Sequence, residues 1–274
     1  MWDVAALIQR HLGESPLEIR VLPAFEGDVV RDVVLPGRRV VFKAGHDDWI
    51  ASEALACKLA REAGVPAPEI LAAVLEDRPF LIMSHVHGIA LSDLSPGRWP
   101  GPLRRAGELL RALHEVRMDG FGSFARGSPA HTRWGDALRT DWLSALDLLD
   151  VDREAYARAV ERHLPNVAGG RLLHGDLVPG HVLVDGDRVS GIIDFGDAMA
   201  GDPAWDLARA SLSRFPGVLA GLLEGYGPVE NLAPRLVLYR MLWSIGTAGI
   251  CVRHRTGNLA RHLTAAEAAL SELS

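Results

Sequence analysis

The most constraining feature of this sequence is a short polar loop between apolar segments, LLHGDLVPGHVLVD at residues 172–185. An apolar pair leads into His174-Gly175-Asp176, a Pro-Gly turn follows, and His181 precedes the alternating strand VLVD. Polar turns held between buried segments are where a fold displays reactive side chains. Two imidazoles and a carboxylate within eight residues fit a metal site, a phosphoryl-transfer loop or a well-packed turn.

The first part of the chain carries strand patterns that are interrupted by one helix. Runs rich in β-branched and apolar residues predict strands at 17–22, 28–35, 39–44, 70–75 and 79–86. A helical pattern at 49–63 follows the third strand, and we expect Asp47 or Asp48 to cap it and Gly64 to end it. These elements predict a small antiparallel sheet with one inserted helix.

The rest of the chain is mostly helical in pattern, apart from a strand pair at 182–185 and 189–195. The change predicts a hinge near residues 84–88. Residues 1–86 are then a strand-rich lobe that ends in the hinge, and residues 87–274 are a helix-rich lobe. A cleft between two lobes is a favoured place for a ligand.

Charge and composition exclude several classes of partner. The net charge of −6 over 274 residues is unsuited to nucleic acid, which needs clustered Lys and Arg. Cys57 and Cys251 are the only cysteines, too few for a disulfide framework or a zinc ligand set, so we expect a cytoplasmic protein. No apolar run of about 18 residues or signal peptide is visible, so no membrane association is expected.

Several motifs occur in a telling order. A lysine in a strand (Lys43 in VVFKAG) and a glutamate in the next helix (Glu53) precede HGDLxxxH at 174–181, IIDFG at 192–196 and GDPAWDLA at 201–208. In this order, over most of its length, the chain resembles the aminoglycoside phosphotransferase family, a branch of the protein-kinase-like superfamily. The resemblance implies an α+β bilobal fold. An N-terminal nucleotide-binding lobe with an antiparallel sheet and one helix would precede a mainly helical catalytic and substrate-binding lobe.

The resemblance also implies roles for individual residues. Lys43 would hold the α- and β-phosphates of ATP or GTP, and Glu53 would fix that lysine. Asp176 would be the catalytic residue that accepts or orients the proton of a substrate hydroxyl. Asp194 would bind Mg²⁺, which prefers oxygen ligands. Phosphoryl transfer needs positioning and charge neutralisation rather than covalent chemistry, so these side chains suit the reaction. Taken alone, Lys43 would be read as a solvated strand lysine.

The segment after residue 200 is expected to support the loop. Asp202 can cap a helix with Pro203 at its first position. Asp206 would then reach back to hydrogen-bond the backbone around His174 and Gly175. We therefore interpret His174 and Asp206 as structural residues.

The nucleotide-binding segments are less regular. With Met83 at the back of the pocket, the carbonyl of Ser84 and the N–H of Val86 are expected to face the purine. The phosphate-covering loop has one glycine, Gly27, flanked by Glu26 and Asp28, which departs from the glycine-rich family pattern. Backbone N–H groups from residue 27 onward are still expected to cover the phosphates.

His181 stands where the family pattern usually has asparagine. We expect His181 to be the second metal-site residue, pointing at the cleft five residues after Asp176. Imidazole is a borderline ligand for Mg²⁺, so Mn²⁺ is expected to be tolerated. The alternative is that His181 only hydrogen-bonds within the loop and that Asp194 carries the metal alone.

The substrate end is harder to interpret. Segment 130–165 has seven acids against five arginines, as any solvated helix pair can have. Trp134 and Trp142 would either wall a pocket or belong to the core. We expect a nucleoside triphosphate and a small-molecule hydroxyl substrate as partners of a monomer or weak dimer.

Three classes of function remain open. The first is an O-phosphotransferase that phosphorylates an antibiotic and gives resistance, with an aminoglycoside as the default and a macrolide or basic peptide antibiotic as alternatives. A metabolic small-alcohol kinase belongs to the same class. The second is a nucleotide-binding pseudokinase, motivated by His181 and the thin phosphate loop. The third is a metal hydrolase using His174, Asp176 and His181, which leaves Lys43 and Glu53 unexplained.

Overall fold

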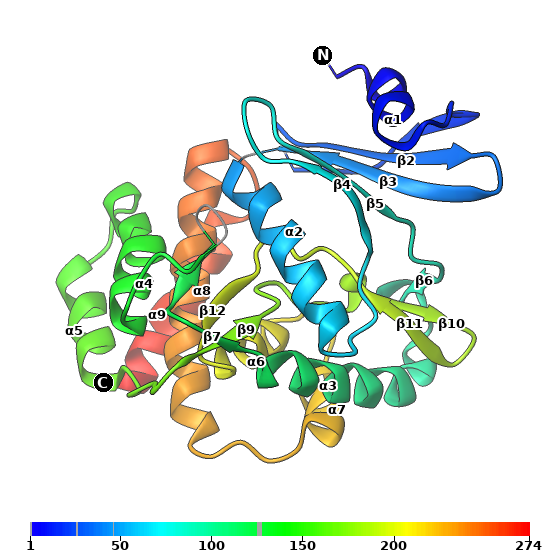
Figure 1. The fold of residues 1–274 in the computed structure, drawn as a ribbon. Helices are drawn as coiled ribbons and strands as arrows, with labels where there is room; N and C mark the ends of the chain where they lie inside the picture. The colour runs from blue at the N-terminus through cyan, green and yellow to red at the C-terminus, as the bar shows by residue number, and fades with distance from the viewer. Residues whose placement is uncertain (1, 26, 46, 125–127) are drawn as a thin grey trace.

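The computed structural model describes residues 2–25, 27–45, 47–124 and 128–274. A sheet-rich N-terminal part lies beside a larger helical part, as Figure 1 shows. This arrangement confirms the predicted mixture of α and β structure, with an antiparallel sheet first and helices after it.

The N-terminal part consists of a sheet between two helices. Its elements are α1 Val4–Leu12, β1 Glu18–Val21, β2 Val29–Leu35, β3 Arg38–Ala44, α2 Asp47–Glu62, β4 Ile70–Val74 and β5 Phe80–Ser84. The strands pair antiparallel in the order β1-β2-β3-β5-β4. Because side chains alternate along a strand, Phe42 packs toward α1 while its neighbour Lys43 faces α2. The sheet therefore presents a lysine on the face that α2 covers.

The C-terminal part surrounds short strands with helices. Its elements are β6 Ile89–Ala90, α3 Pro100–Glu115, β7 Arg117–Met118, β8 Gly122–Ser123, α4 Trp134–Asp141, α5 Arg153–His163, β9 Gly170–Leu173, β10 Val182–Asp185, β11 Arg188–Ile192, β12 Met199–Gly201, α6 Ala204–Ser211, α7 Val218–Tyr226, α8 Leu232–His254 and α9 Leu259–Leu273. The largest core cluster joins these helices, with Trp205 and Tyr239 fully buried in it. Among the described residues, no helix is long and apolar enough to cross a membrane.

The strand ends differ from the predicted ones in ways that affect the site. Strand β5 ends at Ser84 rather than at residue 86, because the chain leaves the sheet there. Strand β11 ends at Ile192, and Asp194 lies beyond it with a left-handed φ of 69°. Asp194 therefore stands on a turn, held in a conformation that costs a non-glycine residue energy.

The start of α2 also corrects the prediction. The helix begins at Asp47, so Asp47 and Asp48 lie inside its first turn and neither precedes it as a cap. The negative side chain of Asp48 in the first turn is stabilised by the helix dipole, which gives an acid a reason to occur there without capping.

Hydrogen bonds between the two parts fix the position of the catalytic-looking hairpin β10–β11. The N–H of Ile192 donates to the carbonyl of Pro66 at 2.8 Å, and Ser190 Oγ donates to the carbonyl of His87. The loop between β9 and β10 and the turn after β11 therefore lie next to the end of the N-terminal sheet.

Candidate active site

The centre of the candidate site is an ion pair that joins distant parts of the chain. Lys43 Nζ on β3 donates to both carboxylate oxygens of Glu53 on α2, at 2.8 and 3.0 Å, and to Oδ1 of Asp194 at 2.8 Å. Glu53 is fully buried and Lys43 nearly so. The three ammonium donors therefore have three carboxylate oxygens as partners, two from Glu53 on α2 and one from Asp194 on the turn after β11.

The electrostatic effects of this pair favour the charged lysine. Burial alone would lower the pKa of Lys43, but the carboxylates of Glu53 and Asp194 outweigh it and the pKa is raised. Burial likewise opposes ionisation of Asp194, yet Lys43 and His181 lower its pKa to about 2. Lys43 and Asp194 are therefore charged at neutral pH.

The loop between β9 and β10 is held from below by one buried carboxylate. Asp206 on α6 accepts hydrogen bonds from the backbone N–H groups of His174, at 2.8 Å, and Gly175, at 2.9 Å. His114 Nε2 on α3 lies 3.0 Å from the same carboxylate. The predicted reach of Asp206 is thus present in the structure. The side chain of Asp202 accepts a hydrogen bond from the N–H of Ala204. The helix begins at Ala204, so Pro203 precedes its first position instead of occupying it as predicted.

His174 packs beneath the loop, as a structural residue does. Its side chain is completely buried against Phe195, with ring centroids 4.5 Å apart, and Nε2 hydrogen-bonds to the carbonyl of Ile193 at 3.0 Å. Burial lowers the pKa of His174, so the ring is neutral at neutral pH. A reacting group would need access that His174 lacks.

His181 faces Asp194. Its Nδ1 lies 2.8 Å from the backbone carbonyl of Asp176, and its Nε2 lies 3.3 Å from Oδ2 of Asp194. A carbonyl only accepts, so Nδ1 donates to it, and Nε2 is the ring nitrogen that faces the Asp194 carboxylate. An unprotonated imidazole nitrogen together with a carboxylate is a ligand pair that fits a divalent metal ion.

The described residues contain no cluster of three or more His, Cys, Asp or Glu side chains that would hold a metal by itself. A hydrolytic metal site normally draws three ligands from the protein. Magnesium in phosphoryl-transfer sites takes one or two carboxylates and completes its shell with phosphate and water. The donor set at His181 and Asp194 therefore fits the second kind of site better than the metal hydrolase that the sequence left open.

Asp176 is paired with an arginine that the sequence analysis missed. Arg209 Nε on α6 lies 2.5 Å from Oδ1 of Asp176, and the guanidinium also lies over the ring of Trp243. Arg209 follows Asp206 by one helical turn, and residues three apart share a helix face. That spacing was a signal that sequence reasoning could have used.

A pocket of about 350 Å³ adjoins this loop. Asp48 and Trp49 from the start of α2, Asp141 from the end of α4, Trp142 and Asp197 line it together with the backbone of residues 175 and 196. Trp142 therefore borders the pocket, whereas Trp134 is buried in the core. Among the described lining residues there is no lysine or arginine.

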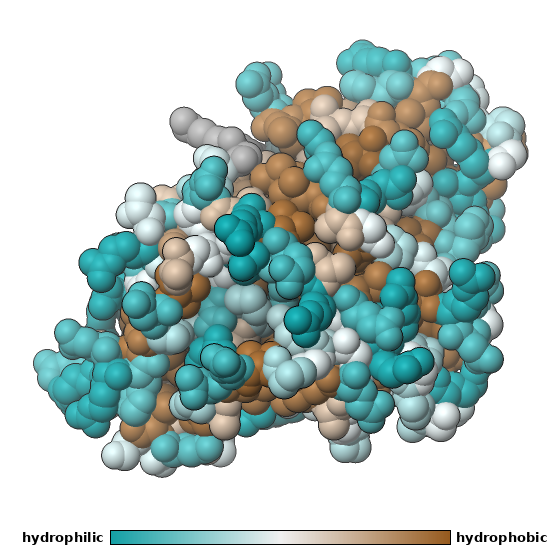
Figure 2. All heavy atoms as spheres, turned by 60° about the horizontal axis from the view of Figure 1, so that its bottom comes forward, coloured by the Kyte–Doolittle hydropathy of each residue, from teal (hydrophilic) through white to brown (hydrophobic). Residues whose placement is uncertain are grey.

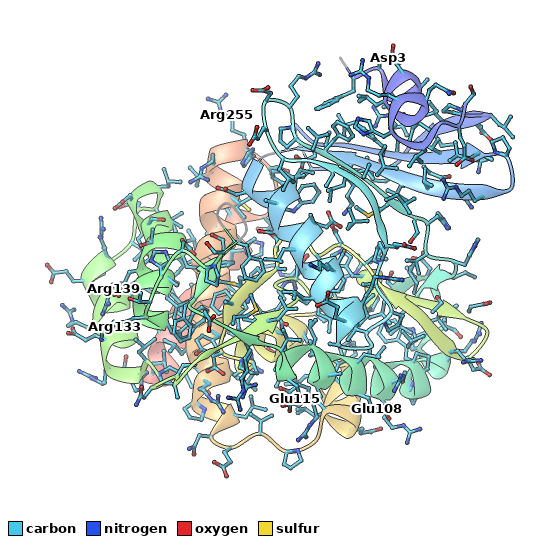
Figure 3. All side chains as sticks on the ribbon, viewed as in Figure 1. Asp3, Glu108, Glu115, Arg133, Arg139 and Arg255 are labelled. Atoms are coloured by element: carbon cyan, nitrogen blue, oxygen red, sulfur yellow. The ribbon has the colours of Figure 1, made fainter. Side chains whose placement is uncertain are left out.

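Asp197 is the least ordinary acid of this pocket. It is open to the pocket but surrounded by protein, and this desolvation, together with the charges of Asp176 and Asp194, raises its pKa to about 7. Burial also raises the pKa of Asp141, against the opposing charge of His131. Arg133, just before α4, and Arg139, within it, extend outward from the molecule (Figure 3).

The other predicted nucleotide contacts remain predictions. Two hydrogen bonds join Ser84 to Glu69. The N–H of Ser84 donates to the carbonyl of Glu69 at 2.8 Å, and the N–H of Glu69 donates to Oγ of Ser84 at 2.8 Å. Val86 follows in the segment that leaves the sheet, and its side chain lies against Gly191. Gly27 has a φ of 94° and open space around it. Glu26, the acidic residue that precedes Gly27 in the sequence, lies outside the described residues.

Comparison with known sequences finds a matching family model and several relatives. The model of the phosphotransferase enzyme family matches residues 19–237. The hygromycin-B 4-O-kinase of Escherichia coli is 27% identical over 166 residues, which are 54% of this chain and 48% of that protein. The homoserine kinase of Parvibaculum lavamentivorans is 32% identical over 205 residues, 69% of this chain and 60% of that protein. The chain thus spans about half to two thirds of the curated relatives it matches.

Solved structures share the fold. The apo form of a thermostable mutant of aminoglycoside phosphotransferase APH(4)-Ia has a TM-score of 0.82 at 20% identity and covers 98% of both chains. A ternary complex of such a mutant with ADP and hygromycin B has a TM-score of 0.76 at 21% identity, over 99% of this chain and 97% of that one. The predicted protein-kinase-like class is therefore confirmed.

The anchoring role of Asp206 predicts a loss of stability in Asp206→Asn. The amide places N–H hydrogens where backbone N–H groups of His174 or Gly175 now donate, which leaves a buried donor unsatisfied. We expect the free energy of unfolding to fall by about 1–3 kcal/mol, measured by urea denaturation at neutral pH. Asp185→Asn, on the exposed end of β10, is the matched control and should change it little. Equal stability of both variants would show that Asp206 is not the anchor.

Proposed function

This chain belongs to the phosphotransferase enzyme family, and on that premise we propose that it is an ATP- or GTP-dependent O-phosphotransferase acting on an amine-bearing small molecule. The observation that carries the substrate class is the pocket beside the Asp176 loop. Its charged lining residues are Asp48, Asp141 and Asp197, with no basic side chain among the described ones. Such a lining attracts ammonium groups and repels carboxylates.

An aminoglycoside is the substrate that fits this pocket best. The related hygromycin-B 4-O-kinase is named for such an activity, and a solved relative holds GDP and kanamycin. Several amines on one molecule would each find a carboxylate, while a hydroxyl group is directed at Asp176. Phosphorylation of such an antibiotic would give resistance to it.

The proposed roles follow from the geometry. Lys43, held by Glu53, would turn its ammonium from Asp194 to the phosphates of the nucleotide. Asp194 and His181 would hold Mg²⁺, which neutralises phosphate charge when bound. Asp176, fixed by Arg209 at 2.5 Å, would accept or orient the proton of the attacking hydroxyl.

A metabolic kinase is the second candidate, favoured by the matches to homoserine kinases. Homoserine carries a carboxylate beside its ammonium group and needs a cation to bind it. Arg209, a basic group beside the loop, already holds Asp176. The acidic lining therefore favours the aminoglycoside over the amino acid.

The first test is a nucleotide-consumption screen with hygromycin B, kanamycin and homoserine, run with ATP and with GTP. We expect turnover with an aminoglycoside, and Asp176→Asn should lower kcat by about 10²–10⁴ while nucleotide binding is kept. Asp185→Asn is the control. Preference for homoserine would select the metabolic kinase, and nucleotide binding without any turnover would select the pseudokinase. Near-normal turnover in Asp176→Asn would remove Asp176 from the chemistry.

Asp197 predicts how affinity for the substrate depends on pH. Its carboxyl group is neutral below its pKa of about 7 and charged above it, so KM for an aminoglycoside should fall as pH rises from 6 to 8. Asp197→Asn should flatten this dependence and raise KM at pH 8 about tenfold, the worth of a charge-assisted hydrogen bond. Asp187→Asn, on the exposed turn after β10, should keep the wild-type profile. An unchanged profile in Asp197→Asn would exclude this contact.

His181 predicts a metal preference. With imidazole as a borderline ligand, Mn²⁺ should support activity comparatively well. His181→Asn supplies an oxygen instead and should keep measurable turnover while shifting the ratio of Mg²⁺- to Mn²⁺-supported kcat toward Mg²⁺. The ratio of Mg²⁺ to Mn²⁺ affinity of the nucleotide complex, measured by calorimetry, should also shift toward Mg²⁺. If neither the kcat ratio nor the affinity ratio changes, His181 is a hydrogen-bonding residue of the loop and Asp194 holds the metal alone.

A further inference from the structure

The outer strand of the N-terminal sheet is unusually bare. Strand β1 stands at the edge of the order β1-β2-β3-β5-β4, and all of its residues are exposed. Leu17 is 71% exposed, Ile19 39% and Val21 73%. Edge strands usually carry a device against further pairing, such as an inward-facing charge or a covering segment. Here Ile19 and Val21, on one face of the strand, are exposed, and so is Leu17 just before it.

The backbone of β1 is oriented for pairing on its free side. The N–H of Leu22 donates to the carbonyl of Val30 at 3.1 Å. Hydrogen bonding alternates along an antiparallel strand, so residues 18 and 20 also face β2. The N–H and C=O groups of Ile19 and Val21 consequently point away from the sheet, whereas the N–H of Leu17, just before the strand, donates to the carbonyl of Val34 at 2.8 Å. Pro16 and Pro23 limit such pairing to the residues between them, because proline cannot donate.

The sequence of β1 is complementary to itself. When Leu17-Glu18-Ile19-Arg20-Val21 runs antiparallel to a second copy with Ile19 opposite Ile19, Glu18 of each copy lies opposite Arg20 of the other. Leu17 then lies opposite Val21. The outward-facing Ile19 pair exchanges backbone hydrogen bonds, and the charged pairs occupy the positions where side chains come closest.

Neighbouring registers are disfavoured by charge. A shift that centres the pairing on Glu18 places two glutamates opposite each other, and a shift that centres it on Arg20 does the same with two arginines. Within one chain Glu18 and Arg20 already form an ion pair, with Arg20 Nη2 2.6 Å from Glu18 Oε2. The same groups are therefore placed to exchange partners across a symmetric interface.

We propose that β1 is a homodimerisation edge, at which two copies of this chain pair antiparallel about Ile19 and join their sheets into one. An interface of this kind is isologous, with the same surface on both copies. One short strand on each side buries less than the standard interface area of about 1,600 Å², so the dimer is weak and depends on concentration. The proposal does not rest on the proposed enzymatic activity.

The test is sedimentation velocity of the full-length chain from about 5 to 500 µM. The wild type should shift from monomer to dimer across this range. Glu18→Arg and Arg20→Glu, each alone, place like charges at both contacts and should weaken the dimer about tenfold or more. The doubly reversed chain, carrying Glu18→Arg and Arg20→Glu together, restores opposite charges and should dimerise like the wild type.

A mixture provides the sharpest arm of the test. The Glu18→Arg chain and the Arg20→Glu chain complement each other, so an equimolar mixture should form heterodimers although neither chain dimerises well alone. Glu154→Arg, in an exposed ion pair of α5, is the matched control and should leave the wild-type dimer intact. The proposal is overturned if the wild type stays monomeric over the whole concentration range. It is also overturned if the Glu18→Arg and Arg20→Glu chains dimerise as strongly as the wild type. Circular dichroism of each variant checks that the fold is kept.

Discussion

The interaction on which the candidate site depends is the buried contact of Lys43 with Glu53 and Asp194. A buried ammonium is stable only when its donors are satisfied, and here two carboxylates satisfy all three. Those carboxylates come from α2 and from the turn after β11, which are separated by about half of the chain. The contact therefore fixes the N-terminal sheet, its helix and the C-terminal hairpin relative to one another. The contact combines one ammonium group with two carboxylates, so an excess of negative charge remains there. A nucleotide-bound metal ion or the ammonium groups of a substrate would neutralise this excess.

Predictions from the sequence were most accurate for short motifs whose residues serve both the fold and the candidate site. The strand and helix order narrowed the fold, and the family resemblance implied both the fold class and the reach of Asp206 to the loop of residues 174–175. The lysine and glutamate were expected to meet, and the structure places them 2.8 Å apart. Strand ends were less accurate because they depend on where the chain leaves the sheet, as at Ser84 and Ile192.

The residues that the sequence did not reveal owe their properties to distant neighbours. The raised pKa of Asp197 comes from desolvation and from Asp176 and Asp194, and the pocket beside it is lined by residues of α2 and α4. Arg209 gains its role only because α6 turns that face toward the loop. The face drawn in Figure 2 shows hydrophilic residues around much of its rim and hydrophobic ones across the centre and upper right, with smaller hydrophobic areas below.

Helix α2 links the two halves of the candidate site. Its first turn supplies Asp48 and Trp49 to the pocket, and one turn later Glu53 holds Lys43. The ammonium of Lys43 lies 5.0 Å from the centre of the Trp49 ring. A side chain at Gly196 would collide with that ring, so the tryptophan also contacts the turn that carries Asp194. A ligand that moves Trp49 must therefore disturb either the lysine or the turn. Because α2 contributes side chains to both the pocket and the Lys43 contact, it is a shared element by which a substrate in the pocket and a nucleotide at Lys43 would be coupled.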